Sequence, residues 1–264
     1  MPYHEPAIAE RRELGPLALL RLHAPELARA ARPGQAALVR CAPPESDDPL
    51  LRRPLYLAGA DQASGLVELL VAPEERGLAW LAAQPAGARL DLYGPVGAGF
   101  ALDGRAGNLL LAGAGPALPA LVFLARAAAD RASGVVLLAA GEPGLLPPPY
   151  MLPPDVEYQT GTDLLALLAA APGSVTGPAG LPASGSLIAW ADRVYLALGE
   201  GLVAGAADAV RAGRLRWQRG FAQAALAGPM PCGLGTCLAC PVETRDGTRL
   251  RCKDGPVFDL RDLR

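Results

Sequence analysis

The chain has 264 residues, a formal net charge of −2 and 51% hydrophobic residues. This composition is typical of a globular protein with room for about two domains and a small appendage. Charged residues make up 19% of the chain, below the roughly 25% that is usual. The composition excludes a disordered chain, and without a surplus of basic residues it argues against nucleic-acid binding.

The sequence contains no segment typical of a membrane protein. Its longest apolar stretch, residues 109–125, is interrupted by glycines and prolines and is shorter than the roughly 20 residues that a membrane span needs. The N-terminal residues mix acids and bases and lack the apolar core of a secretory signal. We therefore expect no membrane association and a cytoplasmic location.

Residues 11–100 contain short apolar segments separated by turn residues. Each segment is as long as a strand and has Gly, Pro or Asp near its ends; the segments read PLALLRLHA, QAALVRCA, RPLYLAGA, GLVELLVAP and ARLDLYG. Several short strands at this density predict an antiparallel β-barrel.

The pattern changes after Gly107, where apolar strands and helices alternate. The segments read NLLLAGAG, PALPALVFLARAAADRA, VVLLAAG, TDLLALLAAA, DRVYLALG and GLVAGAADAVRAG. This alternation predicts a parallel sheet with covering helices. The predicted fold class is therefore β plus α/β, with a barrel over residues 1–103, a nucleotide-binding-like α/β domain over 104–224 and a small C-terminal module over 225–264.

Four of the five cysteines are clustered near the end of the chain. Cys232, Cys237, Cys240 and Cys252 are separated by four, two and eleven residues, in the string PMPCGLGTCLACPVETRDGTRLRCKDG. This C-x4-C-x2-C…C spacing is that of plant-type [2Fe–2S] proteins. The intervening glycines allow the loop to approach a cluster closely enough for backbone N–H groups to donate to sulfur.

Other interpretations of the cysteines remain open at this point. A structural zinc site also uses four cysteines, usually as two short-spaced pairs, and only Cys237 and Cys240 form such a pair. Disulfides are a further alternative, although a cytosolic chain keeps its thiols reduced. The fifth cysteine, Cys41, lies in the apolar run AALVRCAP and is expected to be a buried core thiol.

Three segments upstream have features of nucleotide contacts. Gly113 and Gly115 lie in GAGPALP, between a predicted strand and a predicted helix, where backbone amides can face a pyrophosphate. Arg52 and Arg53 begin a predicted strand, where an arginine can bind phosphate or only border the barrel. The string GPVGAGF lies at the predicted domain junction and could also be no more than a tight connection.

Together these strings resemble one family. RPGQ, LLRRPL, DLYGPVGAGF and CGLGTCLACPVE…RCKDGPVFD, in this order, resemble the electron-transfer subunit of B-type dihydroorotate dehydrogenase, which belongs to the ferredoxin–NADP reductase superfamily. The resemblance extends from about residue 17 to residue 259. It implies FAD on the barrel, a [2Fe–2S] cluster on the four cysteines and NAD as a possible co-substrate.

The resemblance also implies the residues that contact FAD. They are Arg53, Pro54, Leu55 and Tyr56 on one strand, Leu70, Val71 and Ala72 on the next, and then Gly77 and Leu78. Tyr56 and Leu78 stand where relatives have serine and threonine, so two small hydroxyls are missing.

The predicted nicotinamide site departs further from the family. Relatives have a GGGxGxxP turn where this chain has Gly113, Gly115 and Pro116, and Pro116 removes one amide donor. Relatives have Cys-Gly-Pro where this chain has residues 198–200, Leu-Gly-Glu. We therefore expect NAD(H) to bind weakly.

The resemblance implies an oxidoreductase component in pyrimidine biosynthesis that does not itself oxidise dihydroorotate. An FMN-containing catalytic subunit would supply electrons, which pass through the cluster and FAD to NAD⁺. The implied assembly is a heterotetramer with two copies of each subunit. The alternatives are a related flavin and iron–sulfur reductase serving another oxidoreductase, or a flavin-free interaction subunit.

Overall fold

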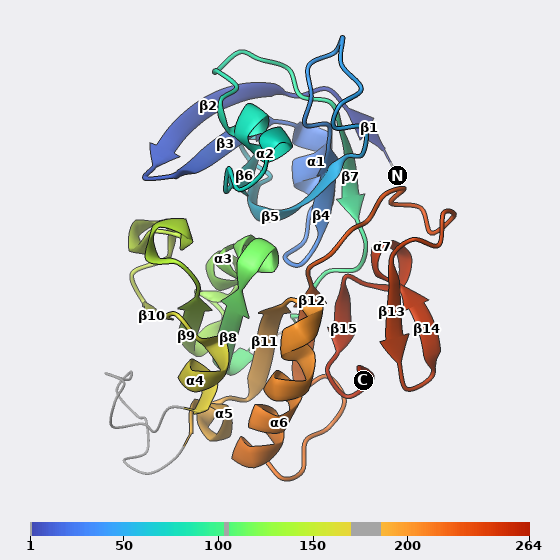
Figure 1. Ribbon diagram of the computed structural model, residues 1–264. Helices are drawn as coiled ribbons and strands as arrows, with labels where there is room; N and C mark the ends of the chain where they lie inside the picture. Colours follow the sequence, from blue (N-terminus) through green and yellow to red (C-terminus); the bar gives the residue numbers. More distant parts are fainter. Residues whose placement is uncertain (1, 103–105, 170–185) are drawn as a thin grey trace.

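The computed structural model describes residues 2–102, 106–169 and 186–264. A barrel-like sheet lies above an α/β layer, and the C-terminal segment packs along one side of both (Figure 1). No helix among the described residues is long and apolar enough to cross a membrane.

The N-terminal part is an antiparallel sheet of seven strands in the order β1-β7-β4-β5-β6-β3-β2. Its strands are β1 (Tyr3–His4), β2 (Ala7–Leu14), β3 (Leu17–His23), β4 (Ala36–Val39), β5 (Arg53–Asp61), β6 (Leu66–Val71) and β7 (Leu92–Val96), with helices α1 (Pro25–Ala30) and α2 (Arg76–Ala82). The sheet curls until its two ends meet, because the N–H of Ile8 in β2 donates to the carbonyl of Ala88 ahead of β7. Leucines, valines and alanines from the strands and both helices fill the interior.

The second sheet has the strand order β10-β9-β8-β11-β12-β15, and all its pairs are parallel except β12 with β15. Its elements are β8 (Ala106–Ala114), α3 (Pro119–Ala128), β9 (Ala132–Ala140), β10 (Val156–Gly161), α4 (Leu164–Ala169), α5 (Leu187–Trp190), β11 (Arg193–Leu198), α6 (Val203–Gly213), β12 (Ala222–Leu226) and β15 (Val257–Asp259). Short 3₁₀ turns lie at Gly115–Ala117, Pro143–Leu145, Pro149–Met151 and Glu200–Leu202. The predicted fold class is confirmed.

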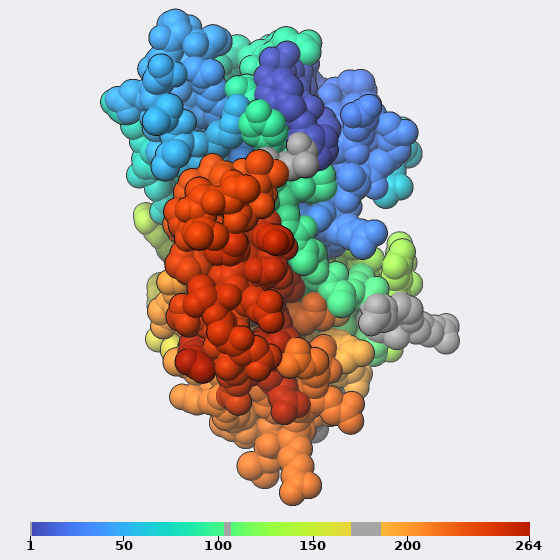
Figure 2. Space-filling model, turned by 90° about the vertical axis from the view of Figure 1, so that its right-hand side faces the viewer, coloured from blue at the N-terminus to red at the C-terminus, as the bar shows by residue number. Residues whose placement is uncertain are grey.

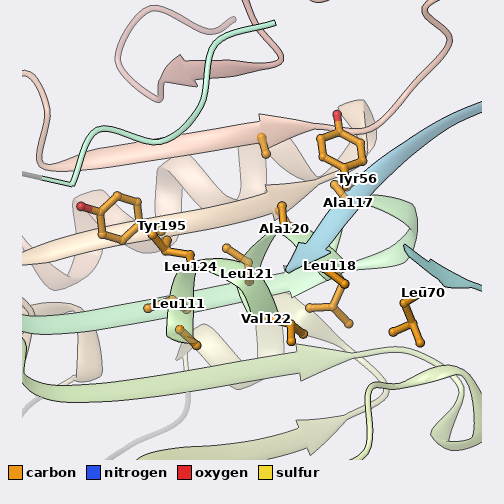
Figure 3. Packing of buried hydrophobic residues seen from close by; sticks show 14 of the residues in the cluster. Tyr56, Leu70, Leu111, Ala117, Leu118, Ala120, Leu121, Val122, Leu124 and Tyr195 are labelled. Atoms are coloured by element: carbon orange, nitrogen blue, oxygen red, sulfur yellow. The ribbon is translucent and has the colours of Figure 1, made fainter. Parts of the chain in front are cut away.

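Both faces of the second sheet are buried, as its apolar strands require. Alternate residues of β8, such as Leu109 and Leu111, face α3, while Leu110 and Ala112 face the layer formed by α4, α5 and α6. The cluster on the α3 face continues into the barrel through Tyr56 and Leu70, and Figure 3 shows Tyr56 beside Ala117 at one end of it. The two sheets therefore share one apolar core, and α3 lies between them.

The C-terminal segment is attached to both sheets. It contains the hairpin of β13 (Pro241–Thr244) and β14 (Gly247–Leu250), the helix α7 (Arg251–Asp254) and β15. In Figure 2 this segment covers the middle of one face, between the barrel and the α/β layer. Of the predicted domain boundaries, position 224 falls inside β12 and position 103 lies outside the described residues.

Two of the strings that carry the resemblance contact each other. The N–H of Ala98 in GPVGAGF donates to the carbonyl of Gly255 in KDGPVF at 2.6 Å. A Cβ on Gly97 would lie 2.3 Å from that same carbonyl, so only glycine fits there. The string at the predicted junction is thus a tight connection between the barrel and the C-terminal segment.

Candidate functional site

The four clustered cysteines lie on or beside one loop between β12 and β13. Cys237 is exposed, Cys232 is half-buried, and Cys240 and Cys252 are buried. Cys252 belongs to α7, which folds back onto the loop because the N–H of Arg251 donates to the carbonyl of Cys240. A loop and a short helix therefore bring all four thiols to the same side of the molecule.

The thiols are arranged as two pairs. The Sγ atoms of Cys240 and Cys252 are 3.4 Å apart, and Cys237 donates to the sulfur of Cys232. No group of three or more His, Cys, Asp or Glu side chains suited to a metal ion occurs among the residues that the structure describes. A single tetrahedral zinc ion would gather four sulfurs at one point, whereas each iron of a binuclear cluster takes two protein ligands. The paired arrangement fits [2Fe–2S] better than zinc.

The backbone of this loop turns tightly and directs an N–H group toward a cysteine sulfur. Gly233, Gly235 and Leu238 all have positive φ, at 66°, 79° and 57°, which turns the chain tightly. The N–H of Leu234 donates to the sulfur of Cys232 at 3.4 Å. Hydrogen bonds from Cys237 and Leu234 lower the pKa of Cys232 to about 5. This sulfur is thus held as a thiolate, the form that binds metal.

The buried pair has the opposite electrostatics. Burial, followed by the hydrogen bond and the charge repulsion that Cys252 shares with Cys240, raises the pKa of Cys252 to about 12. A metal that binds here must displace a proton, as is usual for thiolate sites. The donor set thus fits a cluster whose binding depends on pH.

Arg251, next to Cys252, fastens this module to the α/β layer. Its side chain is almost fully buried, donates to the carbonyl of Pro229 at 3.1 Å and pairs with Glu200. Glu200 is the last residue of the Leu-Gly-Glu segment, residues 198–200, at which the resemblance implies a departure from the family. In this chain that position holds the cysteine module in place.

A cleft between the barrel and the α/β layer leads toward the cysteines. One cavity of 240 Å³ is lined by Leu17, Leu55, Leu70, Ala72, Glu74 and Leu78 of the barrel and by Gly115, Pro116, Leu118, Pro119, Ala140, Gly141, Glu142 and Leu145–Pro147 of the other layer. A second cavity of 370 Å³ is lined by Leu51–Tyr56, Leu78, Pro116 and Gly228–Pro231. The two share Leu55, Leu78 and Pro116, so they adjoin each other as two parts of one cleft, and the second part is lined by Pro231, the residue that precedes Cys232 in the sequence.

The structure brings most of the predicted FAD residues to this cleft. Seven of them line it: Arg53, Pro54, Leu55, Tyr56, Leu70, Ala72 and Leu78. Val71 points to the other face of its strand, into the barrel core. Gly77 lies behind the cleft, where a Cβ would meet Pro49 and Cys41.

The two glycines of the predicted nucleotide turn are placed differently. Gly115 lines the 240 Å³ cavity and has a positive φ of 70° with open space around it. Gly113 is buried, and a Cβ there would lie 2.8 Å from both Ala197 and Leu121. Gly113 thus permits close packing of β8 against β11 and α3, while Gly115 is open to a ligand.

Tyr56 joins the two layers at the cleft. Its hydroxyl donates to the carbonyl of Leu226 at the end of β12, at 2.6 Å, and its side chain is 2% exposed. Burial raises the pKa of this hydroxyl well above its usual range, so it stays protonated and keeps donating. The tyrosine in place of the family's serine therefore adds an interdomain bond.

The polar groups at the barrel side are engaged within the chain. Arg53 forms a bidentate pair with Glu75, in which Nε and Nη2 each lie 3.0 Å from a carboxylate oxygen. The same carboxylate caps α2 by accepting from the N–H groups of Gly77 and Leu78. Glu75 was missed by the sequence reasoning because Glu is not among the usual N-cap residues.

Two other residues of the sequence analysis have structural partners. Arg52 donates to the carboxylate of Asp91 at 2.8 Å and lies over the ring of Tyr93, so it borders the barrel. Cys41 is completely buried in the barrel core, and burial raises its pKa to about 12. The prediction of a core thiol is confirmed.

Fold and site together define the class of this chain, a ferredoxin-reductase-like fold with a C-terminal module of four clustered cysteines. The structure matches the NADH-dependent reduced ferredoxin–NADP oxidoreductase with a TM-score of 0.74 and 19% identity, over 98% of this chain and 89% of that one. It matches the ferredoxin reductase of carbazole 1,9a-dioxygenase in its FAD apo form with a TM-score of 0.60 and 19% identity, over 81% and 64%.

Within that class, the chain is similar in sequence to electron transfer subunits of dihydroorotate dehydrogenase B. The family of iron–sulfur cluster binding domains of that enzyme matches residues 229–264. The chain is 29% identical to the electron transfer subunit of dihydroorotate dehydrogenase B (NAD(+)) from Shouchella clausii, over 88% of this chain and 86% of the relative. It is 39% identical to that subunit from Geobacillus thermodenitrificans, over 42% and 43%.

Proposed function

We propose that this chain is the electron-transfer subunit of a dihydroorotate dehydrogenase and passes electrons between a catalytic subunit and NAD⁺ in pyrimidine biosynthesis. The observation that carries the proposal is the course of the cleft. It begins at the predicted flavin residues and ends at Met230 and Pro231, directly before Cys232. A flavin in this cleft and a cluster on the cysteines would be neighbours.

The residues present fit both groups. Cys232 and Cys237 would hold one iron and Cys240 and Cys252 the other, while Leu55 and its neighbours would line the flavin site. When bound, the cluster supplies one-electron transfer and FAD links it to the hydride chemistry of NAD. Within the chain, Tyr56 ties the barrel to the end of β12, and Arg251 ties the cysteine module to the α/β layer.

The exposed surface of the cysteine loop is the proposed contact with the partner. Leu234 and Leu238 are 56% and 67% exposed on either side of the exposed Cys237. Exposed apolar side chains beside a redox site are typical of a docking surface. We propose an FMN-containing catalytic subunit there, in a heterotetramer with two copies of each chain in the cytoplasm. Residues 1–103, 104–224 and 225–264 would act as the flavin, nucleotide and cluster units.

The first test is the content of the purified protein. After anaerobic purification we expect FAD and a visible spectrum from two irons and two sulfides per chain. Zinc, or iron without flavin, would instead support the flavin-free interaction subunit. The ion pair between Arg53 and Glu75 favours this alternative, because it occupies an arginine that the flavin site would use. Dihydroorotate-dependent reduction of NAD⁺ that requires both subunits would separate the proposal from a reductase serving another enzyme.

A cysteine variant tests the assignment of the loop. Cys237→Ser removes one thiolate and should abolish iron binding while leaving flavin content unchanged, because the barrel and the loop are separate elements. Cys41→Ala is the control for iron content, since this buried thiol belongs to the barrel core cluster, which contains none of the other four cysteines. Iron content measured on both proteins decides the point, and a Cys237→Ser protein with full iron would contradict the assignment.

A further inference from the structure

On the barrel side of the cleft, the guanidinium group of Arg53 is bonded to other residues of the same chain. Arg53 lines the 370 Å³ cavity together with Pro54, Leu55 and Tyr56. Its Nε and Nη2 bind the carboxylate of Glu75, and its Nη1 donates to the carbonyl of Leu51 at 2.6 Å. Both edges of the guanidinium fork therefore already have a partner. A ligand phosphate can gain a bidentate contact with Arg53 only by displacing Glu75.

The carboxylate of Glu75 is equally well satisfied. Each of its oxygens accepts one N–H from Arg53 and one from the backbone of Gly77 or Leu78. Hydrogen bonds from Arg53, followed by those from Gly77 and Leu78, hold the pKa of Glu75 below its usual range, so it is an anion at neutral pH. Arg53, Gly77 and Leu78 are three of the groups predicted to hold FAD, and one internal carboxylate engages all three.

We propose that Glu75 is an internal competitor of the FAD phosphates for Arg53 and thereby lowers the flavin affinity of this chain. This inference rests on the proposed flavin site. The side chains of Arg53 and Glu75 are 28% and 38% exposed, so Glu75 can rotate into solvent without opening the core. An ion pair of this exposure contributes little stability, which leaves it open to displacement by a ligand that fills the cleft.

The competition also has a long-range component. When Glu75 releases Arg53, its negative charge stays beside the incoming phosphates, and like charges at close range repel each other. Both contributions disappear when the carboxylate is replaced by a neutral group. The affinity for FAD should therefore rise on neutralisation, although the variant loses a contact in the free protein.

The test measures the affinity of FAD on the full chain after the flavin has been removed and the cluster retained. Quenching of FAD fluorescence gives the dissociation constant without any turnover. We expect Glu75→Gln to bind FAD about tenfold more tightly than the parent, within the usual range of coupling between two interacting sites. Glu75→Ser should act in the same direction, and because serine is a good N-cap it keeps α2 capped if the amide variant folds poorly.

Two controls make the result specific. Glu45→Gln removes the same charge at an exposed barrel residue that lines neither cavity and should change the affinity less than about threefold, because this carboxylate is not the partner of Arg53. In an Arg53→Gln background the gain from Glu75→Gln should be much smaller than in the parent, since the contact between the two side chains is gone and only the charge repulsion between Glu75 and the phosphates remains. Thermal unfolding of each variant verifies that it is folded.

The outcomes separate the two proposals. Equal FAD affinity for the parent and both Glu75 variants overturns the competition and leaves the flavin site in place. An equal gain with Glu45→Gln, or an undiminished gain without Arg53, also overturns it, because the effect would then be general electrostatics. Absence of FAD binding in every protein, including Glu75→Gln, overturns the proposed flavin function and the competition with it.

Discussion

Two residues at the cleft, Tyr56 and Glu75, form contacts that cannot be predicted from their residue types. Tyr56 occupies a family serine position but donates from one layer to the backbone of the other at 2.6 Å. Glu75 is the middle residue of the charged run Glu74–Arg76, and it caps α2 and pairs with Arg53. The partner of Tyr56 is 170 residues away along the chain, and Glu75 is not a usual N-cap residue. Comparison of single positions with a motif therefore cannot reveal either contact.

The hydroxyl of Tyr56 can be tested by removing it alone. Tyr56→Phe should lower the free energy of unfolding by about 0.5–1.5 kcal/mol, because it deletes one buried hydrogen bond and keeps the packing. Urea denaturation measures the change. Tyr150→Phe, at a side chain that is 67% exposed, should have no measurable effect, and an equal loss in both variants would contradict the role given to Tyr56.

At the scale of elements, the sequence predicted the apolar strands well and the charged ones poorly. The runs that became β3, β4, β5, β6 and β7 stand out because one or both of their faces are buried. Strand β2 was missed because its sequence, AIAERREL, exposes charged side chains along an edge. Strand β10 was missed as well, since it follows a proline-rich loop and is only partly buried.

The candidate site was predictable to different degrees for a similar reason. Cysteine spacing is a local property, so the four ligands and the loop could be recognised from the sequence. The pairing of the thiols, the anchoring of Arg251 to Glu200 and the course of the cleft depend on contacts between residues far apart in the chain. Such contacts follow from the fold and have no local signal.

The contact between GPVGAGF and the C-terminal segment gives a prediction at the same scale. Gly97→Ala places a Cβ against the backbone of Gly255 and Pro256 in a residue with φ of 80°. The matched control is Gly87→Ala, where φ is 88° and nothing lies within 4 Å. Both variants bear the strain of positive φ, roughly 1–2 kcal/mol, and the steric overlap should cost Gly97→Ala about 1–3 kcal/mol more.

Thermal or urea unfolding of the two glycine variants measures this difference directly. Iron content should also fall in Gly97→Ala, because Cys252 is three residues before Gly255. If the two variants are destabilised equally, the close approach of the two strings is not a constraint on the fold.

For the whole molecule, an ion network joins the barrel to the α/β layer. Glu68 of β6 is 9% exposed, lies 2.9 Å from Arg21 of β3 and pairs with Arg126 of α3. A buried carboxylate between two arginines is costly to neutralise, because Arg126 then loses its carboxylate partner and Arg21 loses one of two. The relative position of the two layers thus depends on this residue as well as on the shared apolar core.

Neutralising Glu68 should loosen the two layers. Glu68→Gln is expected to lower the free energy of unfolding by about 1–3 kcal/mol, the usual range for hydrogen bonds to charged groups. Glu10→Gln is the control, since this more exposed carboxylate pairs with Arg21 and Arg12 at the barrel surface and should cost less than about 1 kcal/mol. Equal losses in urea denaturation would argue against a bridge between the layers.

The pairing of β15 with β12 has a consequence for biosynthesis. Because the chain leaves the ribosome from its N-terminus, the barrel and the parallel strands can fold while residues 257–259 are still being made. The cysteine loop, however, is held between β12 and the segment that ends in β15. We therefore expect iron to enter only after these residues have been synthesised, so cluster insertion follows the folding of the flavin cleft.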